Sequence, residues 1–170
     1  MKAYLASHFF NDAFFRWTED FAQYLEENTD LELYVPQRND RINDKKNNDD
    51  QITDIAIAKA DTEALKESNI LIACIDGLTI DDGVAGEIMG HAIMKEMEEE
   101  YNIPGIPRTI IGIITDMRWL GTGENKLYRN QMILGKIKEQ GHFVVGYAGK
   151  EDWKEEVLEI IEEFTKKHGN

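Results

Sequence analysis

The sequence contains a single cysteine, Cys74, and lacks an uninterrupted apolar run of the roughly 18 residues that a membrane-spanning helix needs. One cysteine excludes an intrachain disulfide and a metal cluster held by cysteines. The first residues turn polar at Asn11 and Asp12, too soon for a signal peptide. These absences lead us to expect a reduced, cytoplasmic protein with no membrane partner.

Positive charge is also scarce. The 170 residues include 19 Lys and Arg against 33 Asp and Glu, which gives a formal net charge of −14. Nucleic acid binding depends on clustered Lys and Arg, so this composition argues against a nucleic acid partner. Hydrophobic residues make up 42% of the chain, which is enough for a core, and the length predicts one domain over residues 1–170.

Glycine-rich phosphate-binding motifs are missing as well. Neither Gly-x-x-x-x-Gly-Lys-Ser/Thr nor Gly-x-Gly-x-x-Gly occurs in the chain. The segment after the first apolar run instead reads Ser-His-Phe-Phe-Asn over residues 7–11, which is bulky where a phosphate would need exposed backbone. Aromatic faces there suit a flat ligand such as a nucleobase. The alternative is that Phe9 or Phe10 simply packs into the core.

Short apolar runs alternate along the chain with segments of helical periodicity. The apolar runs predict strands at residues 3–6, 31–35, 70–75, 109–115 and 142–145. The periodic segments predict helices at residues 12–27, 51–67, 84–101, 126–140 and 151–167. Because the runs at 70–75 and 109–115 show no polar alternation, we expect both faces of these strands to be buried, as in a parallel sheet.

This order predicts an α/β fold: a single-domain three-layer sandwich with a five-stranded, mainly parallel sheet, flavodoxin-like or Rossmann-like. Ligands of such sheets bind beyond the carboxyl ends of the strands, near a topological switch point. The candidate site loops are therefore residues 7–11, 36–50, 76–86 and 116–125. The polar stretch at 38–50 predicts either a mobile surface loop or a loop that folds over substrate.

Carboxylates gather where the third predicted strand leads into a helix. Asp81 or Asp82 can cap the helix, and Glu87 lies at or just after its first turn, where the helix dipole favours a negative charge. Gly83 leaves room for a ligand, or else for close packing on the sheet. A pair of carboxylates is what cleavage of a glycosidic bond requires. Asp61, on the preceding helix, is a further acid, or else a solvated surface residue.

At this point the chain resembles the nucleoside 2-deoxyribosyltransferases. The resemblance rests on motifs that occur in the family's order over residues 3 to 132. They are Tyr4-Leu-Ala with Phe10, Tyr-Val-Pro-Gln-Arg-Asn at 34–39, Asp61 with Leu65 and Ser68, Asp76-Gly77, Asp81-x-Gly83-x-x-x-Glu87 with Gly90, Asp116-x-Arg118 and Asn130-x-Met132. Asn69 stands where the family usually has Asp.

The resemblance implies a role for each matched residue. Glu87 would attack C1′ of a 2′-deoxyribose and form a covalent deoxyribosyl-enzyme, and Tyr4 would orient Glu87. Asp61 would protonate the departing base and later deprotonate the incoming one. These roles imply that 2′-deoxynucleosides and free nucleobases are the partners of the enzyme. They also require different surroundings for Glu87 and Asp61, because one must be ionised while the other holds a proton.

The resemblance also implies the substrate-binding residues and the assembly. Asp81 would hold the 5′-hydroxyl of the sugar, Asn130 would do the same from a neighbouring subunit, and Gln37 would contact the base or position Asp61. The remaining residues of the predicted substrate-binding set are Phe10, Gly83 and Met132. The implied assembly is a homo-oligomer, built from dimers that can form hexamers. We expect no cofactor and no metal.

Two alternatives stay open from the sequence. One is a hydrolase of 2′-deoxynucleoside 5′-monophosphates, which would need a phosphate cradle in the first loop; Ser7 is available there, but Phe9, Phe10 and the charge of −14 argue against it. The other is a non-catalytic nucleotide-binding module. Transfer between bases is preferred over hydrolysis only if the intermediate is kept from water.

Overall fold

All five strands run parallel in one sheet, in the order β2-β1-β3-β4-β5. The strands are β1 Lys2–Ala6, β2 Glu32–Tyr34, β3 Ile70–Cys74, β4 Thr109–Ile114 and β5 Gly141–Val145. The computed structural model describes residues 1–48, 52–121 and 127–169. The predicted α/β fold is confirmed, and the strand order is the flavodoxin-like one.

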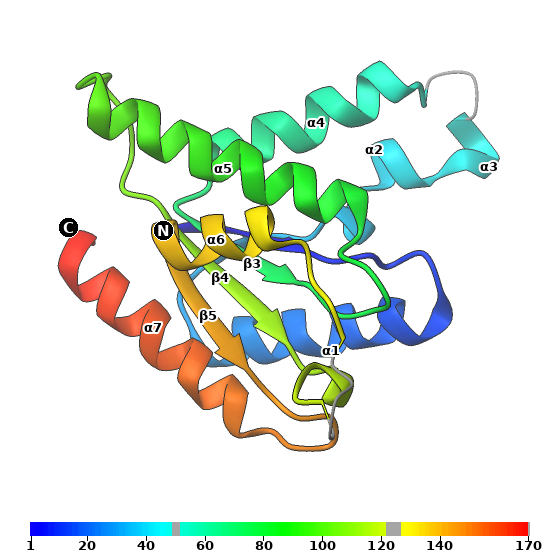
Figure 1. Cartoon of the computed structure of the whole chain (residues 1–170). Helices are drawn as coiled ribbons and strands as arrows, with labels where there is room; N and C mark the ends of the chain where they lie inside the picture. The colour runs from blue at the N-terminus through cyan, green and yellow to red at the C-terminus, as the bar shows by residue number, and fades with distance from the viewer. Residues whose placement is uncertain (49–51, 122–126, 170) are drawn as a thin grey trace.

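Helices cover both faces of the sheet and make the three layers (Figure 1). One face carries α1 Asp12–Asn28 and α7 Asp152–His168, and the other carries α4 Asp54–Glu67, α5 Asp82–Glu100 and α6 Gln131–Gln140. Every residue of β3 and β4 is buried, as the uninterrupted apolar runs predicted. No helix among the described residues is long and apolar enough to cross a membrane.

Strand alternation sorts the side chains of β1 between the two layers. Ala3 and Leu5 pack in the core beneath α1 and α7, whereas Tyr4 and Ala6 belong to the core under α4, α5 and α6. Because successive strand residues point to opposite faces, this sorting aims Tyr4 at the helix that carries Glu87.

The sheet has its topological switch point between β1 and β3. The chain leaves β1 toward β2 on one side, and it leaves β3 toward β4 on the other. The loops that follow β1 and β3 therefore diverge and leave a space between them beyond the carboxyl ends of these strands.

The segment at 38–50 differs from the predicted loop. The 3₁₀ helix Pro36–Arg38 leads into this segment, which contains two short helices, α2 Asp40–Asn43 and α3 Lys45–Asn48; residues 49–50 lie outside the described part. The side chain of Asn39 caps α2, and Ile42 is buried. A cap followed by one buried apolar side chain is enough to favour a helical turn here.

Two predicted helices begin later than expected. The α4 helix begins at Asp54, where Thr53 caps it, and residue 51 of the predicted range lies outside the described part. The α6 helix begins at Gln131 instead of 126, because the Asn130 side chain accepts hydrogen bonds from the amides of Met132 and Ile133. Residue 126 lies outside the described part, and residues 127–130 are not helical.

Candidate active site

A cavity of about 280 Å³ lies at the switch point, beyond the carboxyl ends of β1, β2 and β3. Its size is near the lower end of the range for small-molecule sites, which begins at about 300 Å³. The lining residues come from three predicted site loops and from α4 and α5. They are Ser7, Phe9, Phe10, Pro36, Ile42, Asn43, Ile57, Asp61, Asp81, Asp82, Gly83, Val84 and Glu87.

Glu87 reaches the cavity from the start of α5. The Asp81 side chain caps this helix by accepting hydrogen bonds from the amides of Gly83, at 3.0 Å, and Val84, at 3.2 Å. The hydroxyl of Tyr4, from β1, donates to Oε1 of Glu87 at 2.5 Å. Tyr4 is fully buried, so its ring is held by the core and its hydroxyl fixes the orientation of the carboxyl group.

The protonation of Glu87 is shifted by its surroundings. Burial is the main cause that raises the pKa of Glu87 to about 7; the hydrogen bond from Tyr4 opposes this rise, and the nearby charges of Asp61 and Asp81 add to it. A carboxyl group with a pKa near neutrality exchanges its proton under ordinary conditions, as groups at catalytic sites commonly do. Burial also raises the pKa of the Tyr4 hydroxyl, so this group remains a hydrogen-bond donor.

Asp61 lines the cavity from α4 and accepts a hydrogen bond from a second tyrosine. The hydroxyl of Tyr34, from β2, donates to Oδ1 of Asp61 at 2.9 Å. Burial raises the pKa of Asp61, and the hydrogen bond from Tyr34 opposes the rise. Each of the two carboxyl groups is therefore held by a different tyrosine of the sheet.

The lining of the cavity combines acidic and apolar side chains. Among the described lining residues there are four carboxylates, Asp61, Asp81, Asp82 and Glu87, and no Lys or Arg. The apolar lining residues include Phe9 and Phe10, whose ring centroids lie 4.8 Å apart, and Ile42 and Ile57. Such a cavity repels a phosphate and accepts a neutral, flat ligand with hydrogen-bond donors.

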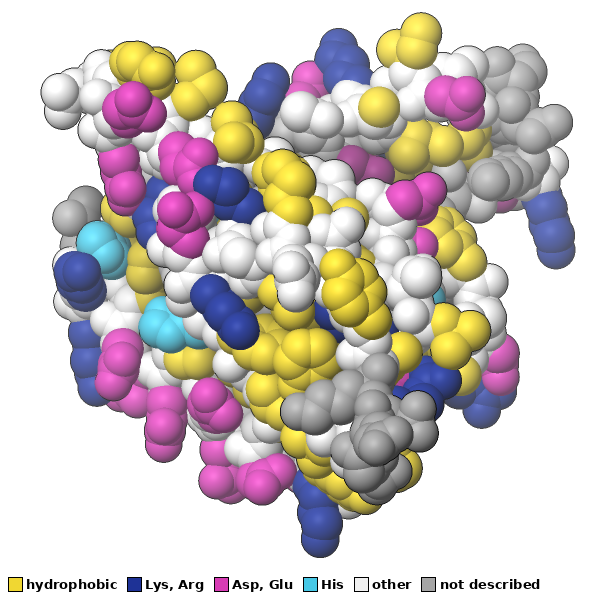
Figure 2. All heavy atoms as spheres, in the orientation of Figure 1, with side chains coloured by type: hydrophobic (Ala, Val, Ile, Leu, Met, Phe, Trp, Pro, Cys, Tyr) yellow, Lys and Arg dark blue, Asp and Glu magenta, His cyan; other side chains and the backbone are white. Residues whose placement is uncertain are grey.

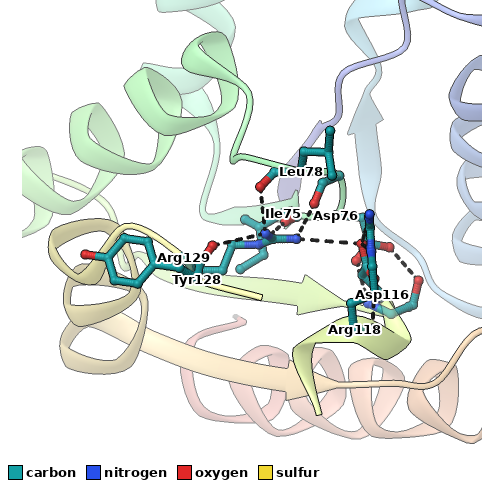
Figure 3. Close-up of polar contacts among 9 residues, drawn as sticks. Ile75, Asp76, Leu78, Asp116, Arg118, Tyr128 and Arg129 are labelled. Atoms are coloured by element: carbon teal, nitrogen blue, oxygen red, sulfur yellow. Dashed lines mark hydrogen bonds and ion pairs between the residues drawn. The ribbon is translucent and has the colours of Figure 1, made fainter. Parts of the chain in front are cut away.

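A buried arginine holds the loop that leads into α5 (Figure 3). Arg129 donates from Nε to the carbonyl of Ile75 at 3.1 Å and from its terminal nitrogens to the carbonyls of Gly77, at 2.5 Å, and Leu78, at 3.3 Å. Gly77 has a φ of 108°, a conformation that favours glycine. Arg129 thus ties the segment before α6 to the loop that carries Asp81.

Asp76 joins the same loop to the end of β4 (Figure 3). Its carboxylate accepts from the backbone amides of Thr115, at 2.7 Å, and Asp116, at 2.9 Å, as well as from the Thr115 hydroxyl. Asp76 therefore holds the loops after β3 and β4 together beside the cavity. In the Asp76-Gly77 motif, Asp76 joins the two loops and Gly77 allows the turn that follows β3.

Comparison with known proteins bears on these observations. The family model described as nucleoside 2-deoxyribosyltransferase matches residues 3–132. The chain belongs to this family. The match includes the strands and helices that supply Tyr4, Asp61 and Glu87. A search of curated proteins found no match.

Solved structures agree with the deoxyribosyltransferase fold. A conserved protein from Enterococcus faecalis V583 is 28% identical, with a TM-score of 0.75 over 96% of this chain and 98% of that chain. A 2-deoxyribosyltransferase from Bacillus psychrosaccharolyticus is 21% identical, with a TM-score of 0.57 over 91% and 89% of the two chains. A 2-deoxyribosyltransferase from Leishmania mexicana is 14% identical, with a TM-score of 0.51 over 78% and 84%.

The structure brings together most of the residues expected from the family motifs. Asp61, Asp81, Gly83 and Glu87 line one cavity, and Tyr4 holds Glu87 from beneath it. Phe10 also lines the cavity, although its side chain is 80% exposed.

Three of the expected site residues lie outside the lining of this cavity within the single chain. Gln37 is buried, and its amide nitrogen donates to Oε2 of Glu19 at 3.0 Å and to the carbonyl of Phe15 at 3.3 Å. Asn130 caps α6, and Met132 is 65% exposed. None of the three lines the described cavity, and neither do the described residues of the candidate loop 116–125.

Sequence reasoning missed Tyr34 and Asn39 as site residues, although both lie in a quoted motif. Tyr34 pairs in register with Tyr4 on the neighbouring strand, and the two ring centroids lie 5.1 Å apart. A prediction of the strand order together with the register would have placed the two tyrosines side by side. Sequence reasoning also missed Ile42 and Ile57 as lining residues; Ile42 lies in the segment for which a loop over the substrate was one of two expectations, and Ile57 lies in α4.

Proposed function

We propose that this deoxyribosyltransferase family member exchanges the base of 2′-deoxynucleosides, by a retaining double displacement through a covalent deoxyribosyl group on Glu87. The observation that carries the proposal is the pair of carboxyl groups, Glu87 and Asp61, which line one cavity and are each oriented by a tyrosine. Cleavage of a glycosidic bond with a covalent intermediate needs one carboxylate as nucleophile and one carboxyl group as acid and base.

In the first half of the reaction, ionised Glu87 attacks C1′ of the sugar. The C1′–N bond to the base breaks, a C1′–O bond to Glu87 forms, and the proton of Asp61 moves to the departing base. In the second half, ionised Asp61 removes a proton from the incoming base, whose nitrogen attacks C1′ and releases Glu87. Tyr4 keeps its proton throughout and stabilises the ionised form of Glu87.

The charge of the cavity supports nucleosides over nucleotides as substrates. Its described lining holds four carboxylates and no cation, so a 5′-phosphate would meet repulsion where a 5′-hydroxyl can donate to Asp81. The transition state resembles an oxocarbenium ion, and a 2′-hydroxyl would withdraw electrons from it and crowd Glu87. A 2′-deoxy sugar is therefore the preferred donor.

We also propose that the chain acts as one domain over residues 1–170 in a cytoplasmic homo-oligomer, in which Asn130 completes the site of a neighbouring subunit. Asn130 is exposed and is flanked by apolar side chains with large exposed fractions, namely Tyr128 at 72% and Met132 at 65%. Figure 2 shows further hydrophobic side chains over α5 and α6, where Ile93 and Met97 are exposed. An exposed apolar surface of this kind favours contact with another subunit.

The test is a chromatographic assay with deoxyinosine or thymidine as donor and free adenine as acceptor, beside a matched reaction without adenine. Deoxyadenosine in the first reaction, with little free sugar in the second, supports base exchange. Equal release of deoxyribose in both reactions indicates a hydrolase instead. Glu87→Ala should abolish exchange and keep the fold, and near-wild-type turnover in this variant would contradict the mechanism.

No turnover of any nucleoside would contradict the proposal and direct the assay to 2′-deoxynucleoside 5′-monophosphates. Failure with these substrates too would favour the non-catalytic binding module, for which equilibrium binding of nucleosides and nucleotides is the measurement.

A further inference from the structure

A chain of two hydrogen bonds leads from Asn39 through Tyr34 to Asp61. The amide nitrogen Nδ2 of Asn39 donates to the Tyr34 hydroxyl at 2.9 Å, and this hydroxyl donates to Oδ1 of Asp61 at 2.9 Å. The other end of the Asn39 amide is also used, because Oδ1 accepts from the backbone amide of Arg41 at 3.2 Å. This last contact fixes which end of the amide faces Tyr34.

The direction of the second hydrogen bond follows from the first. An amide nitrogen can only donate, so the Tyr34 oxygen accepts from Asn39, and the Tyr34 hydrogen is left to point at Asp61. Burial raises the pKa of the Tyr34 hydroxyl to about 12, so this group stays protonated. Asp61 therefore faces a permanent donor whether or not it carries its own proton on the other oxygen.

We propose that Tyr34 is the positioning residue of the acid-base carboxyl group Asp61, and that Asn39 sets the direction of its hydrogen bond. The inference rests on the proposed function, in which Asp61 changes its protonation state once in each half-reaction. A donor fixed on Oδ1 leaves Oδ2 as the atom that exchanges a proton with the base. It also stabilises the ionised form of Asp61 that burial disfavours.

The charged and titratable groups around Asp61 are consistent with this role. From α5 and its cap come Glu87, Asp81 and Asp82, and from the sheet come Tyr4 and Tyr34. The described lining residues from α2 are Ile42 and Asn43, neither of which is titratable. Arg38, Arg41 and Glu63 line a separate groove on the side of Tyr34 and Asn39. Tyr34 itself lines that groove and not the cavity, and its hydroxyl donates the hydrogen bond that opposes the effect of burial on Asp61.

Tyr34→Phe removes the donor and keeps the ring. We expect kcat for base exchange to fall roughly tenfold, while KM for the donor nucleoside changes less than about twofold, because the orientation of a general acid affects the chemical step more than binding. The pKa of Asp61 should rise by about one unit, since a hydrogen bond to a charged group is lost. The optimum of the pH profile, midway between the apparent pKa values of the two carboxyl groups, should rise by about half a unit.

The direct measurement is a carbon-13 NMR titration of the carboxyl groups, with the Asp61 signal assigned by its absence in Asp61→Asn. This readout does not depend on turnover. Tyr24→Phe is the matched control, because it makes the same chemical change against the core on the other face of the sheet. It should leave kcat, the pH optimum and the Asp61 signal unchanged.

Asn39→Asp tests the same relay without touching the ring and keeps an oxygen to cap α2. A carboxylate at 39 would accept the Tyr34 hydrogen and turn it away from Asp61, so the changes should have the same direction as in Tyr34→Phe. In the Tyr34→Phe background the further change should fall below about twofold, because both substitutions act through one hydroxyl.

The outcomes separate this inference from the proposed function. If the wild-type protein exchanges bases and both variants keep its kcat, pH optimum and Asp61 pKa, the role of Tyr34 is overturned while the function stands. If no base exchange occurs in the wild type, the proposed function fails, and the titration still reports whether Tyr34 controls Asp61. An unchanged Asp61 pKa would overturn the inference in that case too.

Discussion

The hydroxyl of Tyr4 donates to Oε1 of Glu87 at 2.5 Å, across 83 residues of sequence. Tyr4 lies in the middle of β1 and is fully buried, whereas Glu87 lies near the start of α5 and faces the cavity. The hydrogen bond favours the ionised carboxylate, and burial favours the neutral acid more strongly. The balance leaves Glu87 with a pKa of about 7, so its charge changes in the neutral range.

Asp61→Asn should isolate the titration of Glu87 when the donor has a leaving group that needs no proton. With 7-methyl-2′-deoxyguanosine, whose base departs as a neutral molecule, we expect release of the base to rise with pH. The midpoint should lie at or somewhat below 7, because Glu87 must be ionised and the Asp61 charge that raises its pKa is gone. With deoxyadenosine, which needs a proton donor, the same variant should lose roughly 100-fold or more in kcat.

The measurement is the initial rate of base release from each donor across the neutral range. Equal losses with both donors would contradict an acid role for Asp61. A rate that does not depend on pH with the methylated donor would contradict the assignment of Glu87 as the titrating nucleophile.

Mixing two inactive variants should restore activity if Asn130 serves a neighbouring subunit. Asn130→Ser keeps an oxygen to cap α6 but removes the amide group, and Glu87→Ala removes the nucleophile. After the two proteins are co-refolded, a mixed dimer has one site with Glu87 and the partner's Asn130 both intact. Because half of the random dimers are mixed and one of their two sites works, about a quarter of wild-type activity should return.

Size-exclusion chromatography with light scattering supplies the control, since a monomer cannot show this complementation. Full activity of Asn130→Ser alone would contradict a role for this residue in the site. Inactive mixtures of confirmed mixed oligomers would place Asn130 in the site of its own chain.

Arg129→Met should destabilise the protein strongly. The Arg129 side chain is fully buried and donates hydrogen bonds to the carbonyls of Ile75, Gly77 and Leu78. Without Arg129 these carbonyl oxygens would lose that donor. We expect a loss of about 3 kcal/mol in the free energy of unfolding, or roughly 10 °C in Tm. Urea denaturation and thermal unfolding measure it.

Arg118→Met is the matched control for Arg129→Met. Both arginines pair with Asp116, Arg129 at 3.9 Å, but the Arg118 side chain is 53% exposed, and exposed ion pairs add little stability. Its Tm should stay close to that of the wild type. A similar loss of Tm in both variants would show that the ion pairs with Asp116, and not the hydrogen bonds to the buried carbonyls, account for the stability.

His91→Leu should reduce the sensitivity of the fold to acid. His91 is fully buried in α5, neither ring nitrogen has a hydrogen-bond partner in the described part of the chain, and burial lowers its pKa to about 3. In the unfolded chain a histidine binds its proton near pH 6.5, so unfolding takes up a proton below that value. The stability associated with neutral His91 is therefore present above about pH 6.5 and is lost as the pH falls toward 3.

Between about pH 7.5 and pH 5 the wild type should lose roughly 2 kcal/mol more stability than His91→Leu. Urea denaturation at the two pH values gives the difference, which does not depend on the effect of the substitution at neutral pH. His142→Leu, at an exposed position, is the control and should match the wild type. If His91→Leu loses as much stability between the two pH values as the wild type does, then groups other than His91 cause the acid sensitivity.

Much of the fold could be predicted from local sequence. The unbroken aliphatic runs of β3 and β4 can only be buried on both faces, and this requirement predicts a central, helix-covered parallel sheet. Likewise, Asp81 in front of a helix that carries Glu87 predicts a capped helix start with a carboxylate in reach of a ligand, because caps and their partners lie within a few residues of each other.

Only the tertiary structure decided which groups meet. Tyr34 contacts Asp61 because β2 pairs with β1, and Gln37 donates to Glu19 on α1 and is not among the lining residues of the cavity. These contacts depend on strand order, register and the packing of helices on each face, and hydrophobic periodicity carries none of this information. The sequence by itself therefore determined the layers and the acidic helix start, and the packing of the sheet determined the pair of tyrosines beneath the two carboxyl groups.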